Sequence, residues 1–91
     1  MKDTADIISK FFFKDETLNL LVKLVGIPSH EGIEQQETKV AACIRDFFLK
    51  EGIEVELIPV VDGRCNVVAT VKGSGGGRNL LFTGHTDTVP P

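Results

Sequence analysis

Hydrophobic residues recur at helical spacing through the first part of the chain. A first helix is predicted to begin at Asp3 or Thr4, because both side chains suit an N-cap. Its apolar face consists of Ile7, Ile8, Phe11 and Phe12. A second helix is predicted from Asp15-Glu16-Thr17 to Gly26, because Gly suits a C-cap and Pro28 cannot continue a helix. Its apolar positions are Leu18, Leu21, Val22 and Val25.

The longest helical pattern extends from Ile33 to Lys50. Acidic residues in its first half and Lys50 near its end match the preference of the helix dipole, and Gly52 is predicted to end it. The predicted apolar stripe is made by Val40, Ala41, Ile44, Phe47 and Phe48. The predicted solvent-facing side is made by Glu34, Gln35, Glu37, Lys39, Arg45 and Lys50.

After Gly52 the pattern changes to the two-residue period of a strand. Residues 53–57 alternate apolar and acidic side chains, residues 66–71 are rich in Val, and Asp62-Gly63 between them is typical of a turn. Residues 80–83 are short and apolar, which predicts a third strand buried on both faces. We therefore expect an α/β fold with two or three N-terminal helices followed by three strands of a larger mixed sheet.

Composition narrows the class of protein. A chain of 91 residues with 42% hydrophobic and 25% charged residues is typical of one small soluble domain or part of a larger one. The net charge of −3 argues against a nucleic-acid partner, which calls for a basic surface. The sequence has no apolar run near the roughly 20 residues that cross a bilayer, and its start lacks the layout of a secretory signal. We expect a cytoplasmic protein without a membrane partner.

Two cysteines, Cys43 and Cys65, have apolar neighbours in the sequence and lack the close spacing of a zinc-binding pair. Without a secretory signal, two cysteines do not indicate a disulfide framework. We expect free, buried thiols.

Residues 84–90, Gly-His-Thr-Asp-Thr-Val-Pro, carry the candidate chemistry. They directly follow the predicted third strand, and open α/β sheets place their sites at the carboxyl ends of such strands. His85 can ligate a metal if its other ring nitrogen is held, and Asp87, two positions on, projects to the same side of an extended backbone. This predicts His85 as a metal ligand and Asp87 as the carboxylate that orients it. A surface loop with a purely structural His–Asp hydrogen bond remains the alternative.

The segment Leu80-Leu81-Phe82-Thr83-Gly84-His85-Thr86-Asp87-Thr88-Val89-Pro90-Pro91 resembles the first metal-binding motif of the dizinc peptidase and deacylase family. That family includes acetylornithine deacetylase, succinyl-diaminopimelate desuccinylase, aminoacylase and carboxypeptidase G. Ile27-Pro28-Ser29, with Glu31-Gly32 and Glu34, is similar to the loop that opens the family's catalytic domain. Asn66-Val67-Val68-Ala69 resembles the strand before the metal motif, so the resemblance covers about residues 15–91.

The resemblance implies a pair of zinc ions, with Co or Mn as possible substitutes, and an amide bond of an N-acyl amino acid or short peptide cleaved by metal-activated water. By the resemblance, His85 would ligate one ion and Asp87 would serve the catalytic site by orienting His85. The family's other ligands, its general-base Glu and its lid and dimerisation domain follow later in the chain than Pro91. Residues 1–91 are then expected to be the N-terminal, incomplete portion of the catalytic domain, inactive alone. We expect His30, the other histidine, to be a solvated loop residue.

Three further expectations concern other modes of interaction. An apolar strand at residues 80–83 would leave an edge that pairs with a second copy of the chain. A small, complete α/β interaction module with a structural His85–Asp87 pair is the main alternative to the hydrolase. A redox or metal-sensing domain using Cys43, Cys65 and both histidines is a third hypothesis, which the spacing of these residues supports little.

Overall fold

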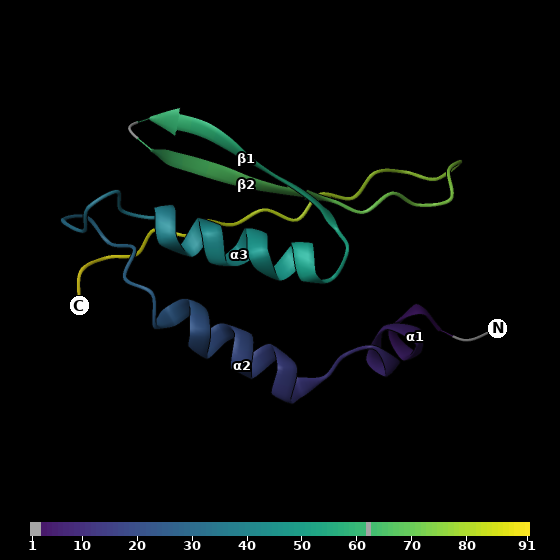
Figure 1. Cartoon of the computed structure of the whole chain (residues 1–91). Helices are drawn as coiled ribbons and strands as arrows, with labels where there is room; N and C mark the ends of the chain where they lie inside the picture. Colours follow the sequence, from purple (N-terminus) through teal and green to yellow (C-terminus); the bar gives the residue numbers. More distant parts are fainter. Residues whose placement is uncertain (1–2, 62) are drawn as a thin grey trace.

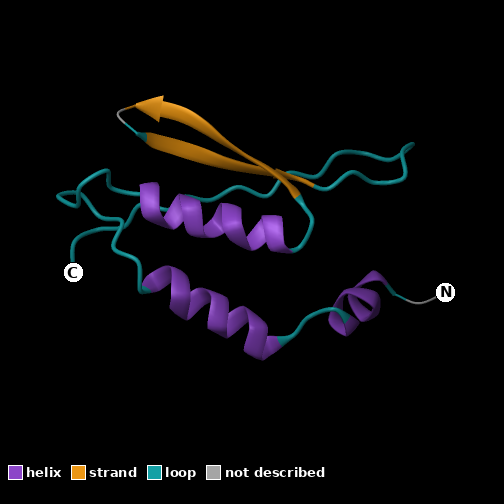
Figure 2. Ribbon diagram, in the orientation of Figure 1, coloured by secondary structure: helices purple, strands orange, loops and turns teal. Residues whose placement is uncertain are grey.

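A computed structural model describes residues 3–61 and 63–91 of the chain. Three helices are followed by one β-hairpin, and α3 lies between the hairpin and α2 (Figures 1 and 2). The elements are α1 Thr4–Lys10, α2 Lys14–Val25, α3 Thr38–Lys50, β1 Glu54–Val61 and β2 Arg64–Thr70. This arrangement confirms an α/β fold at the level of helices packed with a sheet.

The first two helices occur where the apolar periodicity predicts them. α2 begins one residue before Asp15 and ends at Val25, before Gly26. Neither α1 nor α2 contains a buried residue, so their apolar faces are largely open to solvent. The apolar periodicity therefore predicts these two helices correctly. Their apolar side chains, however, are not buried by other described residues.

The third helix begins five residues later than predicted, at Thr38 instead of Ile33. Gln35 and Gln36 have φ values of 57° and 32°, in the left-handed region, and a right-handed helix cannot continue through them. The predicted apolar stripe is retained because all of it lies within α3. The predicted acidic start is wrong, since the first turn of α3 contains no acidic residue.

β1 and β2 pair antiparallel, with Glu54 opposite Thr70 and Leu57 opposite Val67. Exposure alternates at the start of β1, where Val55 and Leu57 are half-buried and the glutamates beside them are exposed, as the sequence predicts. The predicted turn lies at Asp62-Gly63. Asp62 lies outside the described residues, and Gly63 has a φ of 80°, which favours glycine.

The predicted third strand is not formed. Residues 80–83 belong to no β-ladder, and Leu80, Leu81 and Phe82 are 79%, 83% and 86% exposed instead of buried on both faces. A strand exists only when a neighbouring backbone accepts and donates its hydrogen bonds, and apolar content alone does not supply that neighbour. Within the described residues the sheet is the two-stranded hairpin.

The hairpin packs on α3, and this contact forms the core. Among the described residues, Val40 and Ala41 of α3 are the buried hydrophobic side chains. In the described part of the chain, no helix has the length and apolar character needed to cross a membrane. The chain from residue 81 onward passes alongside α3 (Figure 1). Residues 81–87 line a cavity with α3 and β2, and residues 85–91 line another with the end of α2.

Candidate functional site

The segment around His85 lies between two hollows of the surface. A cavity of about 600 Å³ is bounded by α3, β2 and residues 81–87, and includes Glu37, His85 and Asp87 in its lining. A second, of about 480 Å³, is lined by the end of α2, the loop after it and residues 85–91. His85 lines both cavities and is thus accessible from two sides.

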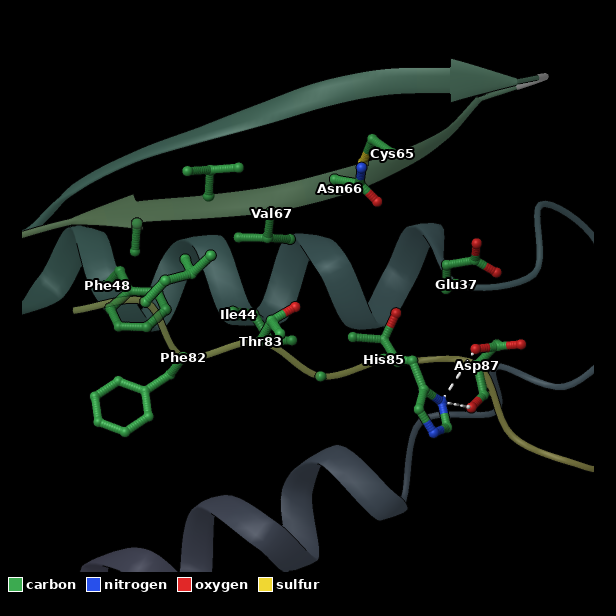
Figure 3. A pocket seen from close by; sticks show the side chains of 15 residues that line it. Glu37, Ile44, Phe48, Cys65, Asn66, Val67, Phe82, Thr83, His85 and Asp87 are labelled. Carbon is green, nitrogen blue, oxygen red and sulfur yellow. Dashed lines mark hydrogen bonds and ion pairs between the residues drawn. The ribbon is translucent and has the colours of Figure 1, made fainter. Parts of the chain in front are cut away.

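The ring of His85 is held by two oxygens of Asp87. Its Nδ1 atom lies 2.9 Å from the Asp87 carbonyl oxygen and 3.1 Å from Oδ1 of the carboxylate (Figure 3). Both oxygens are acceptors, so Nδ1 must be the donor, and in a neutral ring the lone pair is then on Nε2. The ring points away from the hairpin and its side chain is 83% exposed (Figure 3). The predicted His–Asp hydrogen bond is present. The strand that was expected to precede it, at residues 80–83, is not formed.

The described residues do not complete a metal site around this imidazole. Nε2 of His85 carries the lone pair and is suited to bind zinc. A carboxylate that accepts a hydrogen bond from the other ring nitrogen, as Asp87 does from Nδ1, usually orients such a ligand. A catalytic zinc ion generally needs three protein ligands, and no group of three His, Cys, Asp or Glu side chains comes together among the described residues. This part of the chain therefore offers one oriented ligand.

Glu37 is an acidic neighbour that the sequence pattern misassigned. It was predicted to face solvent on a long helix, but its side chain is only 13% exposed, and Arg64 Nε donates to its Oε1 at 2.7 Å. Its second oxygen, Oε2, is buried without a partner in the described structure. The late start of α3 explains the error, because Glu37 precedes the helix and faces β2 instead of water.

Arg64 connects this pair electrostatically to the His85 site. The hydrogen bond with Glu37 is the main cause that raises the pKa of Arg64 above its ordinary value, and the charges of Glu37 and Asp87 add to it against the opposing effect of burial. Arg64 and Asp87 also line one small cavity, with Glu31, Gln36 and Thr88. A cation is thus fixed beside the carboxylate that orients His85.

Ser29 is a second residue whose place the sequence does not reveal. Its side chain is buried, at 4% exposed, and its Oγ–H donates to the Thr86 carbonyl oxygen at 2.8 Å. His30 forms an isolated parallel bridge with Thr88 and is half-buried, so the expectation of a solvated residue is corrected. In the sequence, Ser29 is one of several polar loop residues, and no local signal indicates a partner 57 positions away.

The cysteines lie apart from this chemistry. Cys43 and Cys65 are free, as predicted, but both are half-buried instead of fully buried. They join no metal-binding group with a histidine among the described residues. The geometry thus does not support the redox or metal-sensing hypothesis.

Comparison with known proteins finds similarity to curated enzymes. Over most of its length the chain is similar to proteins named acetylornithine deacetylase and probable carboxypeptidase. It is 36% identical over 73 residues to acetylornithine deacetylase of Shigella sonnei and 34% identical over 80 residues to that of Photorhabdus laumondii. It is also 36% identical over 64 residues to a probable carboxypeptidase of Aspergillus clavatus.

These matches cover 74%, 80% and 69% of this chain but only 18%, 20% and 14% of the three relatives. The chain thus spans about a fifth or less of the length of the curated relatives it matches. No protein-family model matches the chain, and no solved structure matches it.

Proposed function

We propose that this chain is part of a zinc-dependent hydrolase that cleaves the amide bond of an N-acyl amino acid or a short peptide. The observation that carries the proposal is the pair of contacts from Nδ1 of His85 to Asp87, in a chain related to deacetylases and a carboxypeptidase. The contacts keep the proton on Nδ1 and leave the lone pair of Nε2 free. A neutral imidazole with a free lone pair is the form that binds metals.

In this proposal His85 supplies one ligand, and Asp87 fixes its tautomer and makes Nε2 a stronger donor. The other ligands and the general base come from parts of the protein beyond these residues. With the further ligands in place, His85 would help to hold a zinc ion, whose chemistry would be Lewis-acid activation of water and of the scissile carbonyl. The 91 residues alone are then inactive, because one imidazole does not hold a catalytic ion.

The small core also favours a partial catalytic domain over a complete interaction module. Only Val40 and Ala41 are buried hydrophobic side chains among the described residues, while the apolar faces of α1 and α2 and residues 80–82 are open. An exposed apolar surface of this extent is typical of a face that another part of a protein covers. A structural His–Asp pair in a finished module does not account for it.

The test is substitution of three residues in the longer protein, with zinc content and amide hydrolysis as the measurements. His85→Gln should lose metal and activity together. Asp87→Asn should weaken metal affinity by roughly 10–100-fold, as loss of a supporting carboxylate does. His30→Gln, which removes the other imidazole but leaves the backbone bridge between residue 30 and Thr88 in place, is the control and should keep both. Full metal content and activity in His85→Gln would refute the proposal.

A further inference from the structure

We propose that Ser29 is a positioning residue for His85: its hydroxyl holds the Thr86 carbonyl and thereby fixes the Asp87 oxygens that orient the ring. Whether the hydrogen bond of Ser29 matters for metal binding rests on the proposed function. Its effect on the orientation of the His85 ring does not depend on that function and can be measured without metal.

The first support is the burial of Ser29. Among the described residues, Ser29 is the one polar residue that is buried. Its exposed fraction of 4% equals that of Val40 in the core. A buried hydroxyl is disfavoured unless it is hydrogen-bonded, and here it donates at 2.8 Å to a backbone carbonyl. The bond satisfies Ser29 and also fixes the direction of the Thr86 carbonyl.

The second support is the place of that carbonyl in the chain. Thr86 lies between His85 and Asp87, and its C=O belongs to the peptide group that joins Thr86 to Asp87. Rotation about the Cα–C bond of Thr86 turns this planar group and moves Asp87, and with it both oxygens that accept from Nδ1. A donor that holds the Thr86 carbonyl thus restrains the acceptors of His85 without contacting the ring.

The third support is a second attachment next to the first. His30 and Thr88 form a parallel bridge, so residues 29–30 hold residues 86–88 at two consecutive points. Ser29, His85 and Thr86 also line the same cavity of about 480 Å³. Since His85 and Asp87 are themselves largely exposed, this loop supplies the buried contact that their geometry otherwise lacks.

The experiment compares Ser29→Ala with the unaltered 91-residue chain by ¹⁵N NMR of the imidazole nitrogens at a pH where the ring is neutral. The two nitrogen shifts report which one carries the proton, and His85→Gln identifies the His85 signals because the chain has only two histidines. Thr38→Val is the matched control, because Thr38 Oγ1 donates a similar bond, 2.9 Å, to the Gly63 carbonyl away from His85. Ser29→Cys keeps the side-chain shape with a weaker donor.

The expected result is loss of the Nδ1-protonated form in Ser29→Ala, an intermediate population in Ser29→Cys and no change in Thr38→Val. If Ser29→Ala loses its helical circular dichroism, Ser29→Cys decides: a folded chain with fewer Nδ1-protonated rings supports the proposal. An unchanged population in a folded Ser29→Ala or Ser29→Cys overturns it, as does equal loss in Thr38→Val. These outcomes are independent of the hydrolase, which is tested by metal content in the His85→Gln variant of the longer protein.

Discussion

The exposed segment at residues 80–82 makes a sharp prediction about self-association. Leu80, Leu81 and Phe82 lie in backbone outside any ladder, next to a two-stranded sheet. Unpaired apolar backbone of this kind is a site where another chain adds. We therefore expect the 91-residue chain to associate with a second copy through this segment.

The magnitude follows from the exposed area. Covering a large apolar side chain contributes about 1.5–3 kcal/mol, so these three, at 79–86% exposure, contribute roughly 4–7 kcal/mol. Lost translational and rotational freedom costs at least about 4 kcal/mol. The difference of up to about 3 kcal/mol corresponds to association only at millimolar or higher concentration, and backbone hydrogen bonds of about 1 kcal/mol each strengthen it.

Sedimentation velocity over a wide concentration range measures this association. Phe82→Asp removes about 2 kcal/mol of apolar contact and should weaken the association roughly 30-fold. Phe11→Asp is the control, because Phe11 is also exposed, at 75%, but follows α1. A chain that stays monomeric at every concentration, or one that Phe11→Asp disperses while Phe82→Asp does not, would refute the reasoning.

Further predictions concern the core and the part-buried ion pair of Glu37 and Arg64. Val40→Ala removes two buried methyl groups and should lower the free energy of unfolding by about 2 kcal/mol in urea titration, whereas Val25→Ala, at an exposed position, should change it little. Glu37→Gln should lower the melting temperature more than Asp46→Asn, because Asp46 forms its ion pair at an exposed position whereas the Glu37 side chain is only 13% exposed; equal effects would contradict this difference between the two pairs. The raised pKa of Arg64 means that its contribution to stability is complete below its ordinary value and declines only as pH rises through the higher folded value, so the stability difference between Arg64→Gln and the unaltered chain should stay constant from about pH 7 to pH 10. A difference that changes markedly in that interval would show that another group controls the pair.

Local pattern determined much of this protein. The apolar stripes of α2 and α3 and the alternation in β1 are local patterns. The helices make their backbone hydrogen bonds within themselves, and β1 pairs with the next segment of the chain, β2. α2 and β1 lie close to where they are predicted, whereas α3 begins five residues late. The His85–Asp87 contact is also local, since two residues in one short segment can reach each other whatever surrounds them. The relation of the chain to deacetylases rests on the same kind of information.

Tertiary structure decided what depends on distant partners. Residues 80–83 have the composition of a strand but no described neighbour to pair with, so composition alone misplaced them. Glu37 looks like a solvent-facing helical residue until β2 brings Arg64 within 2.7 Å. The bond from Ser29 to Thr86 spans 57 positions, and only the path of the chain past α3 brings its two ends together. Periodicity reports which side of an element is apolar, whereas hydrogen bonds between distant loops depend on how the whole chain folds.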